Sequence, residues 1–286
     1  MRSEREIIEL MKKTALEDED IRALYIEGSR ANPNGPKDIF QDYDIEFIVT
    51  DTKKYIEDKT WIDRFGKRLY MQYPDEWPGS SSDKENWYGW LMQFVDGVRI
   101  DLHVGTKEHA LANLEMYEVL VDKDGILPKQ KEDSDCLYWI SKPTEEEFLC
   151  TCNEFWWCLN NVAKGLWREE IPYVMDMLDQ IIRPQLKRLL EWKIGVKEKF
   201  QVSAGKSGKY MRNYLMEEAY EAFLSTYTAA KAEEIWAAVF RMCVLFQQTA
   251  IDFANEMHFR YNFEEAENSR KFLEYVKELP KDATEI

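Results

Sequence analysis

Two aspartates, Asp42 and Asp44, stand at the head of an apolar run in the segment "FQDYDIEFIV". The run predicts a buried strand over residues 43–49, in which successive side chains point to opposite faces. Asp42 and Asp44 then project side by side from one face. Like charges this close repel each other, so a positive group must lie between them or the pair must face water.

A third carboxylate follows in a predicted hairpin. Residues 88–95 and 98–104 read as strands on either side of Asp96-Gly97, which is among the strongest short hairpin signals. On the second of these strands Asp101 and His103 share a face. A histidine at such a position can touch a site, but it is more often structural.

The three aspartates together suggest a metal site. If strand 98–104 lies beside strand 43–49, Asp101 joins Asp42 and Asp44 in a cluster that is unstable without divalent cations. Mg²⁺ takes carboxylates together with substrate phosphates, and it serves phosphoryl transfer by binding the attacking and leaving oxygens. The pattern therefore predicts magnesium at Asp42, Asp44 and Asp101.

The Gly28-Ser29 pair lies at the end of a predicted strand over residues 23–27. Glycine lets backbone approach a phosphate closely, and Ser29 with the amides of the following turn can donate to phosphate oxygens. The alternative is a tight turn beside a solvated strand face. The order of Gly-Ser, loop, Asp-x-Asp and a later aspartate favours a phosphate cradle with a metal site.

Gly205-Lys206-Ser207 resembles part of a P-loop. That motif needs a glycine five residues before Gly205, where Phe200 stands, and a preceding strand, so a P-loop is excluded. Lys206 and Lys209 still lie in a glycine-containing turn that we expect to lead into a helix at Tyr210. Their ammonium groups could stabilise a leaving pyrophosphate, whereas the alternative is a solvated turn.

Composition limits the possible partners. The 286 residues carry a net charge of −16 without a basic run, which argues against a nucleic-acid partner. The acidic balance suits a small cationic partner, although it also serves solubility alone. Without a membrane-length apolar run or a signal peptide, and with five cysteines lacking zinc-site spacing, we expect a cytoplasmic protein with reduced thiols and no membrane partner.

The elements that position these residues change character along the chain. The first half alternates short apolar runs with turns, and a further strand is expected over residues 68–73. Beyond Pro143-Thr144, long segments show helical spacing of apolar residues. The expected fold class is α+β, with an N-terminal domain (residues 1–140) containing a mixed sheet flanked by helices and an all-helical C-terminal domain (residues 141–286).

These motifs carry a family resemblance. The segments "GSRANP", "DYDIEFIV" and "RIDLHV" resemble the nucleotidyltransferase superfamily of DNA polymerase β type. More narrowly, "YIEGSRANP", "DIFQDYDIEFIV" and "IRPQLKRLLEWKIG" with "GKSGKYM" resemble the aminoglycoside 6-adenylyltransferases, also called streptomycin adenylyltransferases. The resemblance spans nearly the whole chain.

The resemblance implies a reaction and roles for residues. ATP donates AMP to a hydroxyl of streptomycin, expected to be the 6-hydroxyl, and pyrophosphate leaves with Mg²⁺ required; antibiotic resistance follows. Asp42 and Asp44 match the metal pair, and Asp101 matches the third carboxylate, which ligates metal or takes the hydroxyl proton. Gly28, Ser29 and Arg30 match the phosphate-holding turn. The substrate is expected between the two domains, and the oligomeric state stays open, with a monomer as one candidate.

Other questions stay open at this level. Asp176 and Asp179 are carboxylates of the helical domain that could pair with streptomycin guanidinium groups. One alternative function is nucleotidyl transfer to a protein or tRNA, although the acidic balance weighs against RNA. Another is a non-catalytic nucleotide-binding module, which the presence of all three aspartates disfavours.

Overall fold

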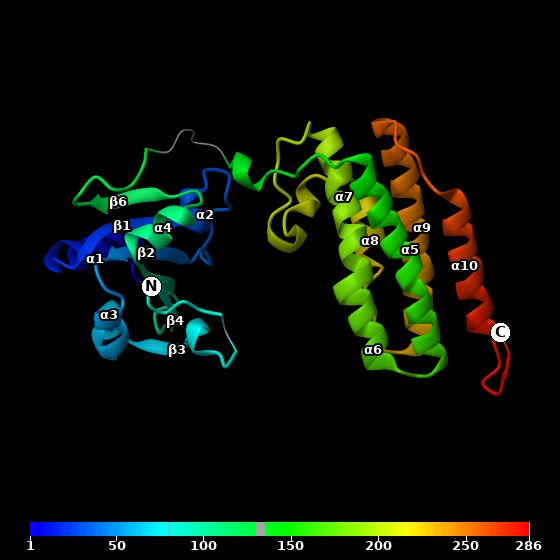
Figure 1. Cartoon of the computed structure of the whole chain (residues 1–286), viewed down its shortest axis with the longest axis horizontal. Helices are drawn as coiled ribbons and strands as arrows, with labels where there is room; N and C mark the ends of the chain where they lie inside the picture. Colours follow the sequence, from blue (N-terminus) through cyan, green and yellow to red (C-terminus); the bar gives the residue numbers. More distant parts are fainter. Residues whose placement is uncertain (80, 130–134, 286) are drawn as a thin grey trace. The chain divides into compact units, whose positions relative to one another are not determined.

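The apolar alternation of the first half folds into a six-stranded sheet. The computed structural model describes residues 1–79, 81–129 and 135–285. The chain divides into two units, Met1–Leu137 and Tyr138–Ile286; the first contains the sheet and the second is helical, and Figure 1 labels many of their elements. This arrangement confirms the predicted α+β fold class.

The sheet has the strand order β3-β4-β5-β2-β1-β6. Its strands are β1 (Ile21–Glu27), β2 (Tyr43–Val49), β3 (Arg68–Gln72), β4 (Trp87–Phe94), β5 (Arg99–Gly105) and β6 (Glu118–Asp122). Strands β2 and β5 run parallel and all other neighbours run antiparallel, so the sheet is mixed as predicted. Five strands lie within two residues of their predicted bounds, whereas the edge strand β6 was not predicted.

One face of the sheet carries the larger core of this unit. Helix α1 (Glu4–Glu17) begins with a capping box of Ser3 and Glu6 and buries Ile7 and Met11 there. The strands supply the other side of this core with Leu24, Ile26, Tyr43, Ile45, Phe47, Val49, Ile100, Leu102 and Val104. The alternate residues of β2 and β5 must therefore point to the opposite face.

That opposite face is only partly apolar. Helix α4 (Lys107–Ala112) and Tyr117 cover Tyr25 and Ile48 in a smaller core. Most of the remaining positions of β2 and β5 on this face are polar, and they include Asp44 and Asp101. The fold thus leaves one region of a well-packed sheet available for chemistry.

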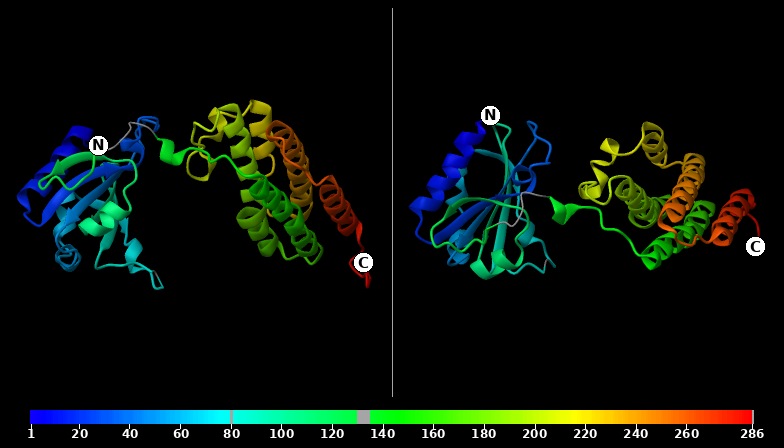
Figure 2. Two further views of the ribbon diagram at one scale, coloured as in Figure 1. Left: turned by 45° about the horizontal axis from the view of Figure 1, so that its top comes forward. Right: turned by 90° about the horizontal axis from the view of Figure 1, so that it is seen from above.

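The second unit is a helical bundle in which α5, α7, α9 and α10 pack on one another (Figure 2). Helix α5 begins with a capping box of Thr144 and Glu147, where the sequence predicted a helix start. A π-helical turn at Met177–Ile182 precedes α7, whose first turn contains Pro184. Phe155 and Phe246 stack at 3.7 Å between ring centroids in the core.

The remaining bounds complete the description. The helices are α2 (Gly28–Ala31), α3 (Lys53–Glu57), α5 (Glu145–Trp167), α6 (Ile171–Asp176), α7 (Arg183–Lys197), α8 (Glu217–Leu224), α9 (Ala232–Met257) and α10 (Phe263–Glu278). Short 3-10 helices lie at Trp61–Phe65, Pro74–Glu76, Cys136–Tyr138, Lys206–Gly208 and Met211–Asn213. Within the described ranges, none of the helices is long and apolar enough to span a bilayer. Cys152, Cys158 and Cys243 are buried thiols, and Cys150 is an exposed thiol.

Candidate active site

The three predicted aspartates come together on the polar face of the sheet. Asp44 on β2 and Asp101 on β5 are direct partners in the parallel pairing, and Asp42 immediately precedes β2. Each offers a carboxylate oxygen within 4.8 Å of the others. Asp101 is buried, whereas Asp42 and Asp44 are half-buried.

Arg99 is the positive group at this cluster. Its Nε donates to Oδ1 of Asp101 at 2.9 Å and its Nη2 donates to Oδ2 at 2.5 Å. The same Nε lies 3.8 Å from Oδ2 of Asp42. The pKa of Arg99 is raised, first by its bonds to Asp101. Arg99 therefore offsets some of the repulsion between the carboxylates of the aspartates. This role of Arg99 was not predicted from the sequence.

The remaining negative charge is partly neutralised by protons. Burial, followed by the charges of Asp42 and Asp101, raises the pKa of Asp44 to about 7. Glu27 faces Asp44 across the β1–β2 pairing, and burial followed by the charge of Glu46 raises its pKa to about 8. Three carboxylates gathered within 4.8 Å of one another match the hard oxygen ligands that Mg²⁺ prefers.

A second polar row lies beside the aspartates. Glu46 and His103 are partners in the β2–β5 pairing, and Oε1 of Glu46 lies 3.0 Å from Nδ1 of His103. Burial lowers the pKa of His103, but Glu46 and then Asp101 raise it overall above its ordinary value. The ring of Trp87 stacks on His103 at 4.8 Å. The pair follows the aspartates by two residues on each strand, a spacing that could have identified it.

His103 lies flat against the neighbouring strand because Gly89 has no side chain. A Cβ at Gly89 would lie 2.3 Å from Cδ2 of His103. Trp87 also stacks on His109 of α4 at 4.9 Å. The imidazole is thus fixed by ring contacts as well as by Glu46.

The Gly28-Ser29 turn begins where β1 ends. Gly28 has a φ of +67°, and a Cβ there would lie only 2.0 Å from Oδ2 of Asp44. This close approach requires glycine. In the part of the chain that the structure describes, the buried hydroxyl of Ser29 has no hydrogen-bond partner. A donor in that state beside a carboxylate cluster fits a phosphate oxygen.

Arg30 follows in the same turn, but its contacts are with the protein. Its Nε donates to the carbonyl oxygen of Asp42 at 2.8 Å and its Nη2 donates to that of Gln41 at 2.9 Å. Its Nη1 lies 3.2 Å from Oε2 of Glu4. The turn and the segment before β2 are thereby linked.

Lys206 and Lys209 belong to the helical unit. Both are exposed, and the 3-10 helix Lys206–Gly208 lies between Gly205 and Lys209. The helix expected at Tyr210 is wrong, because a second short 3-10 helix follows and α8 begins only at Glu217. Positive φ values at Gly205, Ser207 and Gly208 prevent a continuous helix here.

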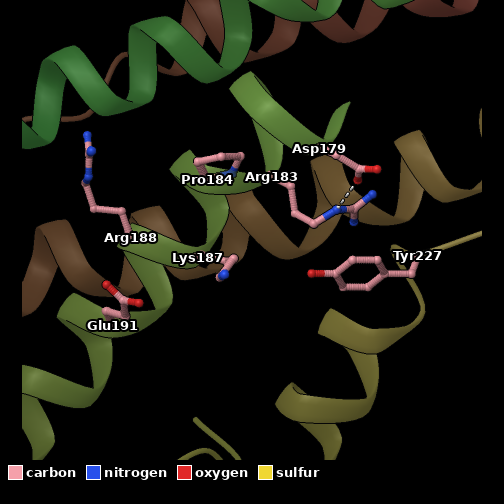
Figure 3. A pocket seen from close by; sticks show the side chains of 7 residues that line it. All are labelled: Asp179, Arg183, Pro184, Lys187, Arg188, Glu191 and Tyr227. Carbon is pink, nitrogen blue, oxygen red and sulfur yellow. Dashed lines mark hydrogen bonds and ion pairs between the residues drawn. The ribbon is translucent and has the colours of Figure 1, made fainter. Parts of the chain in front are cut away.

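A pocket of about 350 Å³ lies in the helical unit (Figure 3). Its lining consists of Asp179, Arg183, Pro184, Lys187, Arg188, Glu191 and Tyr227. The turn with Lys206 adjoins it, since a Cβ at Gly208 would lie 3.4 Å from Cε of Lys187. Asp179, considered above for streptomycin, instead accepts from Nε of Arg183 at 3.0 Å.

Arg183 is fixed in the wall of this pocket. It is 3% exposed, its Nη1 donates to the hydroxyl of Thr226 at 2.5 Å, and its guanidinium lies 3.8 Å from the ring centre of Tyr227. Figure 3 shows Lys187 and the hydroxyl of Tyr227 directed toward the same space. Burial raises the pKa of Glu191, opposed by Lys187 and then Arg188. The pocket therefore carries two cationic groups besides Arg183.

A mixed sheet with a Gly-Ser turn and three aspartates clustered at two neighbouring strands has the features of a nucleotidyltransferase. Comparison with known proteins narrows this class. Residues 1–276 match the streptomycin adenylyltransferase family, and the chain belongs to that family.

Individual relatives are similar over most of their length. Aminoglycoside 6-adenylyltransferase of Bacillus subtilis (strain 168) is 37% identical over 265 residues, covering 91% of this chain and 93% of that protein. The protein of the same name from Campylobacter jejuni is 36% identical over 264 residues, covering 91% of each. A crystal structure of an aminoglycoside 6-adenyltransferase from Bacillus subtilis covers 98% of this chain and 100% of that chain, at 33% identity and a TM-score of 0.49.

Proposed function

We propose that this protein transfers AMP from ATP to a hydroxyl group of streptomycin, expected to be the 6-hydroxyl, with release of pyrophosphate. The observation that carries the proposal is the cluster of Asp42, Asp44 and Asp101, within 4.8 Å of one another, in a member of the streptomycin adenylyltransferase family. The two similar proteins from Bacillus subtilis and Campylobacter jejuni are named aminoglycoside 6-adenylyltransferases.

The aspartates have distinct roles in this proposal. Asp42 and Asp44 would hold Mg²⁺ through their carboxylate oxygens, and Asp101 would be either a further ligand or the base for the acceptor hydroxyl. Bound Mg²⁺ would supply positive charge to the phosphate oxygens on which negative charge develops. The hydroxyl oxygen forms a bond to the α-phosphorus, the bond to the leaving pyrophosphate breaks, and the hydroxyl proton passes to a carboxylate such as Asp101.

The Gly28-Ser29 turn positions the phosphates. The unpartnered hydroxyl of Ser29 donates to a phosphate oxygen, and Gly28 permits the approach of the turn to Asp44. Preorganised donors of this kind stabilise phosphoryl transfer because they do not reorganise during the reaction.

Cationic side chains of the helical unit are proposed to hold phosphate. Lys206 and Lys209 flank the turn beside the pocket, and Lys187 is half-buried within it. Charge-assisted hydrogen bonds from ammonium and phenol groups to phosphate are stronger than neutral ones. The net charge of −16 then favours approach of a cationic aminoglycoside over that of a nucleic acid.

The test is pyrophosphate release with ATP, Mg²⁺ and streptomycin. We expect streptomycin-dependent release from the wild type and its loss in Asp42→Asn and Asp101→Asn. Asp51→Asn is the matched control, because this exposed aspartate lies just beyond the other end of β2. If streptomycin does not increase pyrophosphate release by the wild type, the acceptor assignment is refuted. The assay would then turn to other aminoglycosides, and after them to protein and tRNA acceptors.

A further inference from the structure

The guanidinium of Arg30 joins three parts of the sheet unit. It donates to the carbonyl oxygens of Asp42 and Gln41 at 2.8 and 2.9 Å. It lies 3.6 Å from the ring centre of Tyr43 and 3.2 Å from a carboxylate oxygen of Glu4. The side chain is only 13% exposed, so these contacts are made in a largely enclosed setting.

We propose that Arg30 is a positioning residue for the metal pair, holding the backbone of Asp42 against the Gly28-Ser29 turn, rather than a ligand of phosphate. The inference rests on the proposed metal role of Asp42 and names a further residue on which that role depends. The family resemblance by itself groups Arg30 with the phosphate-holding turn.

Asp42 needs such support because it lies outside the sheet. Asp44 and Asp101 are held by the parallel pairing of β2 and β5, but β2 begins only at Tyr43. The carbonyl group of Asp42 is held instead by Arg30. The carboxylates of Asp42 and Asp44 keep a defined arrangement only when the backbone of Asp42 is fixed.

A second link reinforces the first. Nε2 of Gln41 donates to the carbonyl oxygen of Ser29 at 2.9 Å, so the turn and the segment before β2 are tied in both directions. The phosphate-holding turn and the metal pair are thus parts of one rigid construction. Displacing Arg30 toward a phosphate would break both of its carbonyl contacts.

This arrangement requires arginine and not merely a cation. Arginine presents a planar fork of donors that can bind two carbonyl oxygens while stacking on a ring, whereas lysine is a single point charge. Arg30→Lys therefore separates the two roles, since it keeps the positive charge that a phosphate ligand needs and loses the fork.

The experiment measures binding of a non-hydrolysable ATP analogue to the full-length protein as Mn²⁺ is varied. Calorimetry reports the analogue, and electron paramagnetic resonance reports bound Mn²⁺, both without streptomycin and without turnover. Loss of outer contacts to metal ligands typically weakens metal binding by roughly 10–100-fold. We expect Arg30→Lys to raise the Mn²⁺ concentration for half-saturation by about 10-fold, with analogue affinity recovered at saturating Mn²⁺.

Two further variants keep the test decisive. Gln41→Leu removes the second link and should raise the Mn²⁺ concentration for half-saturation by less than Arg30→Lys does. If Arg30→Lys folds poorly, Gln41→Leu still tests the link against the wild type. Arg22→Lys is the matched control, because Arg22 binds Asp124 with two donors and contacts none of the three aspartates. It should leave Mn²⁺ binding unchanged.

The outcomes separate this inference from the proposed function. If wild type binds Mn²⁺ with the analogue and Arg30→Lys binds both equally well, the positioning role is overturned and the metal site stands. If Arg30→Lys loses analogue affinity that saturating Mn²⁺ does not restore, Arg30 acts on phosphate and the inference is also overturned. If the wild type binds neither, the metal site and this inference fail together.

Discussion

Replacing Gly28 with alanine should lower activity by about 100-fold or more at a modest cost in stability. The φ of Gly28 is +67°, where a residue with a Cβ carries strain of about 1–2 kcal/mol. The added Cβ would also lie 2.0 Å from Oδ2 of Asp44, whereas ordinary contact begins at 3.4 Å, so the oxygen must retreat by about 1.4 Å. Metal–ligand distances tolerate deviations of only about 0.2 Å.

Gly125 provides a matched control for this substitution. Its φ is +64°, almost the same as that of Gly28, but a Cβ there would meet no atom within 4 Å. Gly125→Ala should therefore lose about 1–2 kcal/mol of unfolding free energy and keep its activity. Gly28→Ala should lose at least that much stability and, in addition, about 100-fold or more in kcat, as expected for a misplacement of about 1 Å.

The assay combines urea unfolding with pyrophosphate release at saturating ATP, Mg²⁺ and streptomycin. Subtracting the effect of Gly125→Ala isolates the contact with Asp44 from the backbone strain. Gly28→Ala with full activity would refute the reasoning, because the turn could then move away without disturbing Asp44, or Asp44 would not be a metal ligand.

Two further predictions concern the charges of the site and of the pocket. In the metal-free protein the raised pKa values of Asp44 (about 7) and Glu27 (about 8) mean that the folded state retains protons that the unfolded state loses above about pH 4. The free energy of unfolding should therefore fall as pH rises from about 5 to 8, and Glu27→Gln should flatten the slope in thermal unfolding without metal; an unchanged slope would contradict this. In steady-state kinetics, Lys187→Met should raise KM for ATP about tenfold by removing one charge-assisted hydrogen bond. Lys193→Met is the control, because Lys193 lies on the same helix and pairs with Glu256, and it should leave KM unchanged. Equal effects of the two substitutions on KM would exclude the pocket from nucleotide binding.

Much of the sheet and the site's acidic groups could be predicted because their signals are local. The alternation in residues 43–49 fixes which face carries Asp44, and the Asp96-Gly97 turn fixes where β5 begins. One assumption was needed, namely that β5 lies beside β2, and the parallel pairing of Asp44 with Asp101 confirms it.

The missed features depend on contacts between strands or on partial burial. Arg99 and Asp101 share a face in any strand, but that Arg99 turns back onto Asp101 depends on the space around it. The pair of Glu46 and His103 can be found only once Asp44 is placed opposite Asp101, because that register brings the next residues of the same face together. Strand β6 is an edge strand whose residues are exposed or half-buried, so its apolar pattern is weak.

Without metal, the cluster of aspartates is stabilised by the guanidinium of Arg99 and by a proton on Asp44. Both can be displaced when metal binds. Asp44 shares its environment with a proton at neutral pH, and Asp101 is bound by an arginine whose side chain is 49% exposed. The guanidinium is the more exposed partner, since the side chain of Asp101 is only 11% exposed, so Arg99 can turn toward solvent when another cation takes its place. Under the proposed function, the guanidinium of Arg99 must leave Asp101 before Asp101 can accept the hydroxyl proton. The proton on Asp44 must leave before Asp44 can hold metal. Binding of metal and nucleotide is then coupled to proton release, and affinity for the metal should strengthen with rising pH over the same interval in which the metal-free protein loses stability.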